Sequence, residues 1–230
     1  DDDVDIVMFP KDFNKLTCII ERDYPQYYRV MTFENTENWY SKMCKLQIRG
    51  AYIISSDGSK TPVFIDINKL HSIPDSAWLR WKQRRKIELL NLSLGVLSGE
   101  IIPTSWKSKI TIAQFSRLGK MRLGLLLEKS LCRYDHLMTK RVGIMCNTLT
   151  ANPYTGTCGY DTDITERYWH MSPQFLPFED TNLMTYAHVE DYLDWQYTSA
   201  WRDPYPEEKR VTKHDVKSYE IEPWVLERIK

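Results

Sequence analysis

Positively charged residues in the middle of the chain are the side chains best suited to chemistry in this sequence. Between Trp78 and Arg141 there are fourteen Lys and Arg against four Asp and Glu, a net charge of +10, whereas the rest of the chain carries −10. Like charges concentrated in neighbouring elements build a surface potential that attracts phosphate or another acidic surface. We therefore expect an anionic partner. The acidic ends of the chain are the alternative partner, either within one fold or between copies.

These basic residues form two groups with helical spacing. The first, a basic collar at the start of a predicted helix, consists of Arg80, Lys82, Arg84, Arg85 and Lys86. The second, a basic row on another predicted helix, consists of Arg122, Lys129, Arg133 and Lys140. At about 100° per residue, the gaps within the row bring its members to one side of the helix. Cations next to Trp78 and Trp81 can hold phosphates while bases stack on the rings. The alternative is a solvated helix face with both tryptophans anchored in the core.

A second possible chemistry is metal-dependent hydrolysis by Asp161, Asp163 and Glu166, whose oxygens suit a hard cation. Such residues also cap turns and helix starts. Other catalytic patterns are incomplete: Ser98 is displaced by one position from a G-x-S-x-G elbow. The spacing of Gly119 and Gly124 is that of a P-loop, but the Lys-Ser/Thr pair is missing. We therefore predict a non-enzymatic protein without a cofactor, and a hydrolase or nuclease is the alternative.

The cysteines and histidines predict neither a disulfide framework nor a metal site. Five cysteines are widely spaced, without a C-x-x-C pair. The gaps between Cys158, His170 and His188 are too long and irregular for zinc ligands on one turn or helix face. Mostly buried thiols fit a reducing compartment, which would be cytoplasmic or nuclear, or a virion. The acidic Asp1–Asp3 is unlike a secretory signal, and no apolar run approaches the roughly 20 residues of a membrane span.

The elements that must position these residues predict an α+β fold. Strand-like segments favour an N-terminal antiparallel sheet, with Ile6–Phe9 able to add a short strand. The segments are Thr17–Ile20, Tyr27–Phe33, Gln47–Ser55 and Thr61–Ile67. An Asp57-Gly58 turn between two apolar runs predicts a hairpin. Further strands are expected at Lys109–Phe115, Arg141–Leu149 and Val216–Ile221.

About three helices are expected to pack on this sheet. The first begins after a cap at Asp75 and ends near Gly95 or Gly99. Its second half is apolar nearly all round, which is typical of a buried helix. The second covers Lys120–Thr139, with an apolar stripe toward the core, and the third covers Glu179–Ser199.

The domain organisation predicted from composition has three parts. Residues 1–15 form an acidic arm, residues 16–200 a single domain with its basic centre at 78–141, and residues 201–230 an extended tail. Before the last helix lies a long segment, 151–178, rich in proline and aromatic residues, and such loops are often functional. Its aromatic residues are the candidates for protein contacts: Tyr154, Tyr160, Trp169, Phe175 and Phe178.

Together these features predict a structural or assembly protein that associates with itself. Its basic centre would contact nucleic acid, nucleoprotein or an anionic membrane surface, and its aromatic loop and acidic ends would contact protein. This profile is similar in type to that of small viral matrix and nucleocapsid-associated proteins. A docking subunit of a stable multiprotein complex is the third hypothesis, beside the hydrolase.

Overall fold

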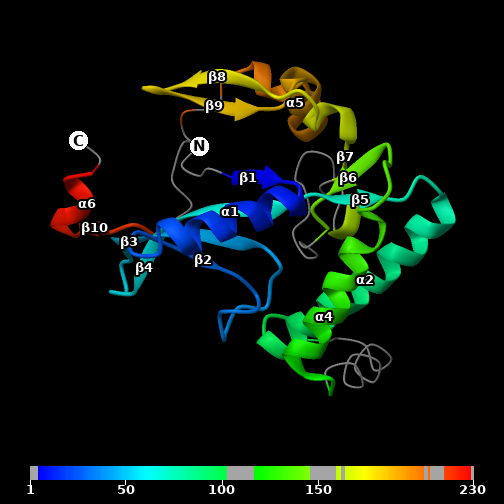
Figure 1. The fold of residues 1–230 in the computed structure, drawn as a ribbon, viewed down its shortest axis with the longest axis horizontal. Coiled ribbons are helices and arrows are strands. Elements are labelled where there is room, and N and C mark those ends of the chain that lie inside the picture. The colour runs from blue at the N-terminus through cyan, green and yellow to red at the C-terminus, as the bar shows by residue number, and fades with distance from the viewer. Residues whose placement is uncertain are drawn as a thin grey trace. The chain divides into compact units, whose positions relative to one another are not determined.

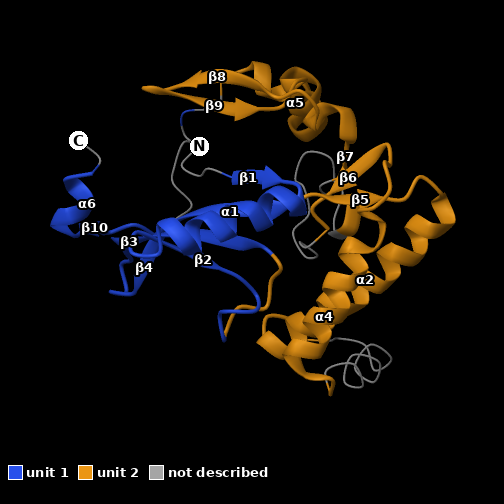
Figure 2. Cartoon of the chain, viewed as in Figure 1, with its two compact units in different colours: residues 1–37, 43–69, 206–230 blue, residues 38–42, 70–205 orange. Residues whose placement is uncertain are grey.

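The structure is a computed structural model that describes residues 5–102, 117–145, 159–161, 164–204, 207 and 215–228. It confirms a mixed α+β protein with a five-stranded sheet and several helices. Figure 2 shows its two compact units: unit 1 contains residues 1–37, 43–69 and 206–230, and unit 2 contains residues 38–42 and 70–205. None of the helices in the described part of the chain has the length and apolar character needed to cross a membrane.

Unit 1 is built on the five-stranded sheet (Figure 1). Its strands lie in the order β1 (Asp5–Met8), β4 (Lys60–Lys69), β3 (Cys44–Ile54) and β10 (Ser218–Ile221), and β2 (Tyr28–Met31) pairs with a separate stretch of β3. Only the β1–β4 pair of this sheet is parallel. The hairpin predicted at Asp57-Gly58 is confirmed, with a φ of 82° at Gly58. The predicted arm and tail thus contribute β1 and β10, and β10 is followed by α6 (Pro223–Leu226).

The strand predicted at Thr17–Ile20 is wrong, because these residues belong to helix α1 (Pro10–Asp23). A proline at the first helical position is favourable, since its missing N–H would be unpaired there anyway. Phe13, Leu16 and Ile20 then recur at helical spacing and pack in the core cluster of unit 1. The β-branched residues favoured a strand, but the period of the apolar side chains is that of a helix.

In unit 2, α2 (Ala77–Ser98) and α4 (Gly119–Leu131) pack side by side (Figure 1). Helix α2 ends as predicted at Gly99, which has a φ of 83°. Helix α4 is shorter than predicted, because the chain continues as the 3₁₀ helix η1 (Cys132–Tyr134). Each helix contributes three fully buried apolar side chains to the core: Ile87, Leu90 and Leu94 from α2, and Leu123, Leu127 and Leu131 from α4.

A small antiparallel sheet lies at the start of α2. Its strands are in the order β5 (His71–Ile73), β6 (Arg141–Gly143) and β7 (Ile164–Glu166). The cap predicted at Asp75 is wrong: Ser76 holds the N-cap position of α2, and the Asp75 carboxylate accepts a hydrogen bond from the backbone N–H of Lys140. This bond joins the start of α2 to the start of β6. The strand predicted at Lys109–Phe115 lies outside the described residues.

The third predicted helix, Glu179–Ser199, is wrong over its first part. A hairpin of β8 (Gln174–Phe178) and β9 (Thr181–Thr185) precedes α5 (Val189–Tyr197) and the 3₁₀ helix η4 (Thr198–Arg202). Glu179 has a φ of 51°, a left-handed conformation that a helix interior does not contain. The predicted aromatic loop therefore contains regular structure, including the 3₁₀ helices η2 (Gly159–Asp161) and η3 (Arg167–His170).

Candidate anion-binding groove

A groove lies between the first turns of α2 and the end of α4. Its volume is about 490 Å³, and its lining residues are Trp78, Leu79, Lys82, Gln83, Lys86, Ser130, Arg133 and Tyr134. Trp78, Lys82 and Lys86 share one face of α2 because they are spaced by four residues. The 3₁₀ helix η1 supplies Arg133. This basic groove therefore brings together part of the basic collar and part of the basic row, which the sequence places on separate helices.

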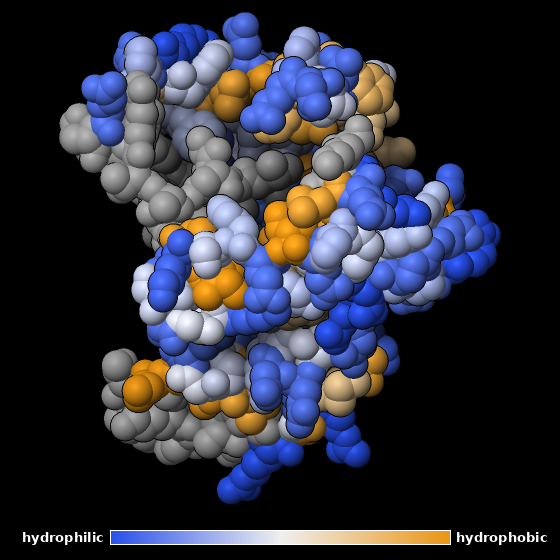
Figure 3. Space-filling view, turned by 90° about the vertical axis from the view of Figure 1, so that its left-hand side faces the viewer, coloured by the Kyte–Doolittle hydropathy of each residue, from blue (hydrophilic) through white to orange (hydrophobic). Residues whose placement is uncertain are grey.

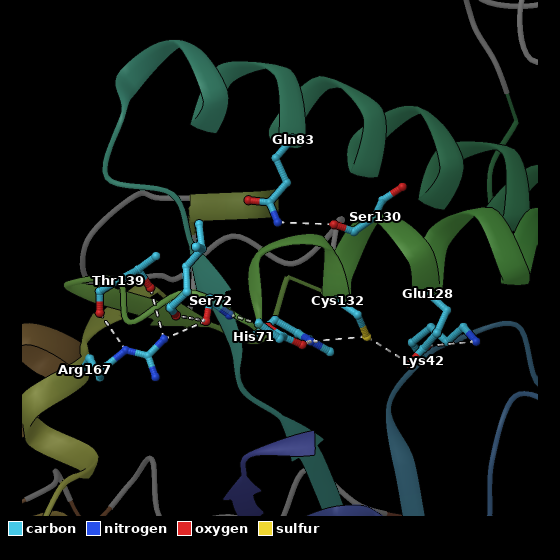
Figure 4. Close-up of polar contacts among 11 residues, drawn as sticks. Lys42, His71, Ser72, Gln83, Glu128, Ser130, Cys132, Thr139 and Arg167 are labelled. Atoms are coloured by element: carbon cyan, nitrogen blue, oxygen red, sulfur yellow. Dashed lines mark hydrogen bonds and ion pairs between the residues drawn. The ribbon is translucent and has the colours of Figure 1, made fainter. Parts of the chain in front are cut away.

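A buried hydrogen-bond network ties the two helices together beneath the groove. Gln83 is only 4% exposed, and its amide nitrogen donates to the backbone carbonyl of Ser130 at 3.3 Å (Figure 4). The Tyr160 hydroxyl donates to the other end of the same amide at 2.7 Å. Burial raises the pKa of Tyr160 well above its usual range, so the hydroxyl keeps its proton at any physiological pH. These bonds fix Gln83 between α4 and Tyr160 in the wall of the groove.

The walls of the groove carry positive charge beside an open aromatic ring. Lys82 and Lys86 are exposed on α2, and Arg133 is exposed on η1. Within the described part of the chain, none of these three cations forms an ion pair. Trp78 is 59% exposed, and the Lys82 ammonium lies 3.6 Å from the centre of its ring. Exposed cations and a stackable ring in one concavity are suited to a phosphate attached to a planar group.

The other residues of the basic collar and row have different surroundings. Arg84 forms ion pairs with Glu88 and Asp161, so its charge is already balanced. Arg80 donates to the carbonyl of Pro74. The remaining members are exposed but do not line the groove: Arg85, Arg122, Lys129 and Lys140. The interpretation of Trp78 and Trp81 as core anchors is wrong, because both are more than half exposed.

The carboxylates suggested for hydrolysis are engaged elsewhere. Asp161 pairs with Arg84, and Glu166 pairs with Arg141 at 2.9 Å. Asp163 lies outside the described residues. Neither described carboxylate belongs to a cluster of metal-ligating side chains found in the described part of the chain. At Asp161 and Glu166, the two described positions, the structure therefore offers no support for the hydrolase hypothesis.

The aromatic residues predicted for protein contacts separate into two kinds. Tyr160 is fully buried, and Trp169 is a core residue whose ring lies edge-on to those of Tyr192 and Trp195. Phe175 and Phe178 are exposed on β8. Tyr154 lies outside the described residues. Among the described members of this set, the two phenylalanines of the hairpin are therefore the ones available for surface contacts.

No protein-family model, curated protein or solved structure matches this chain. The groove and the exposed surfaces are therefore the features that bear on function. Sequence reasoning identified the cations of the groove but missed Gln83, Ser130 and Tyr134. One signal in the sequence could have indicated Gln83. It lies four residues before Ile87, on the side of α2 that faces the core, and a polar side chain there needs hydrogen-bond partners.

Proposed function

We propose that this protein is a non-enzymatic assembly protein that binds single-stranded nucleic acid in the basic groove. The observation that carries the proposal is the convergence of Lys82, Lys86 and Arg133 on one groove with the exposed ring of Trp78. Phosphates would contact the three cations, and a base would stack on the indole. A single strand fits this chemistry better than a duplex, because its bases are free to stack on a side chain.

Binding of a nucleic acid by the three cations should be sensitive to salt. Each phosphate that a Lys or Arg neutralises releases condensed counterions, so affinity falls as salt rises. For single strands, the logarithm of the binding constant falls with the logarithm of the salt concentration with a slope of about −0.7 per phosphate. Three cations predict a slope near −2. Stacking on Trp78 adds about 1–3 kcal/mol per base and depends little on salt. The groove therefore predicts binding with both a salt-dependent and a salt-independent part.

Fluorescence anisotropy tests the proposal directly. A labelled single-stranded RNA of about 16 nucleotides is titrated with the full chain over a series of salt concentrations. We expect saturable binding, a negative salt slope and quenching of tryptophan emission by the stacked base. Absence of binding at low salt, or binding with a flat slope, would contradict an electrostatic groove.

An anionic membrane surface is the second candidate, and a separate observation favours it. Met121 and Leu125 of α4 and its N-cap residue Leu118 are exposed and lie three and four residues apart, so they form one stripe. Arg122 and Lys129 flank this stripe. Apolar side chains next to cations are typical of helices that lie in a membrane interface.

One double variant distinguishes the two candidates. Met121→Ser with Leu125→Ser removes the apolar stripe and leaves the cations in place. If the groove binds nucleic acid, RNA affinity stays at the wild-type level in this variant. If α4 lies on a membrane, co-sedimentation with vesicles containing phosphatidylserine falls, and the wild type shows no RNA binding. Neutral phosphatidylcholine vesicles are the control for the charge contribution.

The protein-contact part of the proposal rests on the β8–β9 hairpin. All residues of β8 and all but the last of β9 are exposed. Figure 3 shows apolar side chains at the surface among hydrophilic ones on one face of the molecule. A two-stranded hairpin is marginally stable by itself, and exposed apolar surface commonly marks an interaction site. We assign this hairpin to self-association, in keeping with an assembly protein.

A further inference from the structure

Three metal-ligating side chains meet where β5 reaches η1. His71 lies in β5, Cys132 begins η1, and Asp135 follows η1. One ligand atom of each residue lies within 4.8 Å of those of the other two. Figure 4 shows His71 and Cys132 side by side, with Glu128 and Lys42 next to them. We infer that these three residues bind a zinc ion at a site separate from the groove, although the groove residues Arg133 and Tyr134 lie between two of its ligands in the chain.

The geometry suits a tetrahedral ion. The Nδ1 atom of His71 lies 2.8 Å from an oxygen of Asp135 and 3.9 Å from the sulfur of Cys132. With zinc bonds of about 2.0–2.3 Å, ligand atoms at tetrahedral angles are about 3.3–3.8 Å apart. Small side-chain shifts convert one arrangement into the other. The ion would replace the hydrogen that now joins Nδ1 to the carboxylate, and the fourth position is left for water.

The ligand types favour zinc over the hard cations. A thiolate, an imidazole and a carboxylate form a mixed set that suits a borderline-soft ion, whereas Mg²⁺ and Ca²⁺ prefer oxygen alone. Charge also balances: Cys132 as thiolate and Asp135 together carry two negative charges, which match Zn²⁺. The neighbouring Glu128 has its own cation, since Lys42, only 4% exposed, lies 3.2 Å from it.

The surroundings hold the ligands in place. His71 is 1% exposed, and the second oxygen of Asp135 accepts a hydrogen bond from the backbone N–H of Ser72 at 2.8 Å. Such outer contacts are the usual means of orienting metal ligands. A catalytic Cys-His-Asp arrangement is a poorer explanation, because it needs cysteine and carboxylate on opposite ring nitrogens. Here both face Nδ1.

Metal content of the full chain tests the inference. The purified protein is stripped with a chelator, exposed to ZnCl₂, desalted and analysed for bound metal. Loading with Co²⁺ in place of Zn²⁺ gives a second measurement, because a cysteine thiolate bound to Co²⁺ produces an intense charge-transfer absorption in the near ultraviolet. We expect one zinc per chain and this absorption band in the wild type. Wild-type protein that keeps no stoichiometric metal would overturn the inference.

Two cysteine variants assign the site. Cys132→Ser should lose both the bound zinc and the thiolate band, and circular dichroism shows whether its fold is preserved. Cys18→Ser removes an exposed free thiol in unit 1 and should keep both signals. If Cys132→Ser keeps the thiolate band, the ion is bound elsewhere and the inference fails. Wild-type protein without stoichiometric metal overturns the inference even if Cys132→Ser does not fold.

Discussion

The ammonium group of Lys82 lies 3.6 Å from the centre of the Trp78 ring, one turn apart on α2. This cation–π contact places a positive charge against one aromatic ring while the indole stays largely open to solvent. Trp81 is exposed to a similar extent, at 54%, but does not line the groove. Comparing variants of the two tryptophans therefore distinguishes stacking inside the groove from a general effect of exposed aromatic side chains.

Replacing Trp78 should weaken binding of single-stranded RNA. We expect Trp78→Ala to cost about 1–3 kcal/mol of binding free energy, the usual contribution of one stacked base. Trp81→Ala is the matched control and should leave Kd nearly unchanged. Anisotropy titrations of both variants measure the difference. Equal losses of RNA affinity in the two variants would contradict a stacking role of Trp78.

The hydroxyl of Tyr160 should contribute to the stability of unit 2. Tyr160→Phe leaves the amide oxygen of Gln83 without its buried donor, and an unsatisfied buried acceptor costs about 1–3 kcal/mol in free energy of unfolding. Tyr168→Phe is the control, since Tyr168 is half exposed and its ring stays in place. Urea denaturation measures both. A Tyr160→Phe variant as stable as Tyr168→Phe would contradict the network beneath the groove.

Stability should depend on pH through His170. Burial, together with the nearby Arg167, lowers the pKa of His170 from 6.5 to about 4 in the folded chain. Between these pH values the unfolded chain binds a proton that the folded chain does not. The contribution of the neutral His170 to the free energy of unfolding is therefore complete above pH 6.5 and is lost as the pH falls toward 4.

The His170→Gln variant measures that contribution. Its loss of stability between about pH 7.5 and about pH 5 should be smaller than that of the wild type, because the titrating group is gone. His136→Gln removes an exposed histidine and should keep the wild-type dependence. Parallel pH dependence in wild type and His170→Gln would show that the histidine is not held neutral.

Self-association should depend on the β8–β9 hairpin. Phe175 and Met184 face each other in the strand register, and they are 68% and 64% exposed. Phe175→Ser with Met184→Ser should shift the chain toward monomer, because the contact loses most of its apolar surface. Light scattering with size-exclusion chromatography measures the mass. An oligomer of unchanged mass would place the contact elsewhere.

Turn and helix-end residues predicted the parts of the fold that depend on backbone conformation at single positions. The Asp57-Gly58 turn and the end of α2 at Gly99 both follow from glycine at a positive φ. At Thr17–Ile20, β-propensity conflicted with a helical period, and the contacts made by Phe13 and Ile20 decided for helix. The two-residue turn Glu179-Asp180 between β8 and β9 contains no glycine or proline.

The same distinction holds for the sites. Charge and spacing found Lys82, Lys86 and Arg133, because exposed cations are visible in a sequence. The cluster of His71, Cys132 and Asp135 was missed, since His71 is 61 residues from Cys132 and only the tertiary structure joins them. Part of the signal was present: Glu128, Cys132 and Asp135 recur at helical spacing on the side of a helix that carries core residues.

Charge reversal in the groove tests the central claim most directly. One variant carries Lys82→Glu, Lys86→Glu and Arg133→Glu, and its control carries Lys11→Glu, Lys15→Glu and Arg29→Glu, three exposed cations of unit 1. Both variants change the net charge equally, so a general loss of positive charge affects them alike. We predict that the groove variant loses RNA binding at low salt, whereas the control keeps most of the wild-type affinity. Equal affinities in the two variants would contradict the basic groove as the binding site.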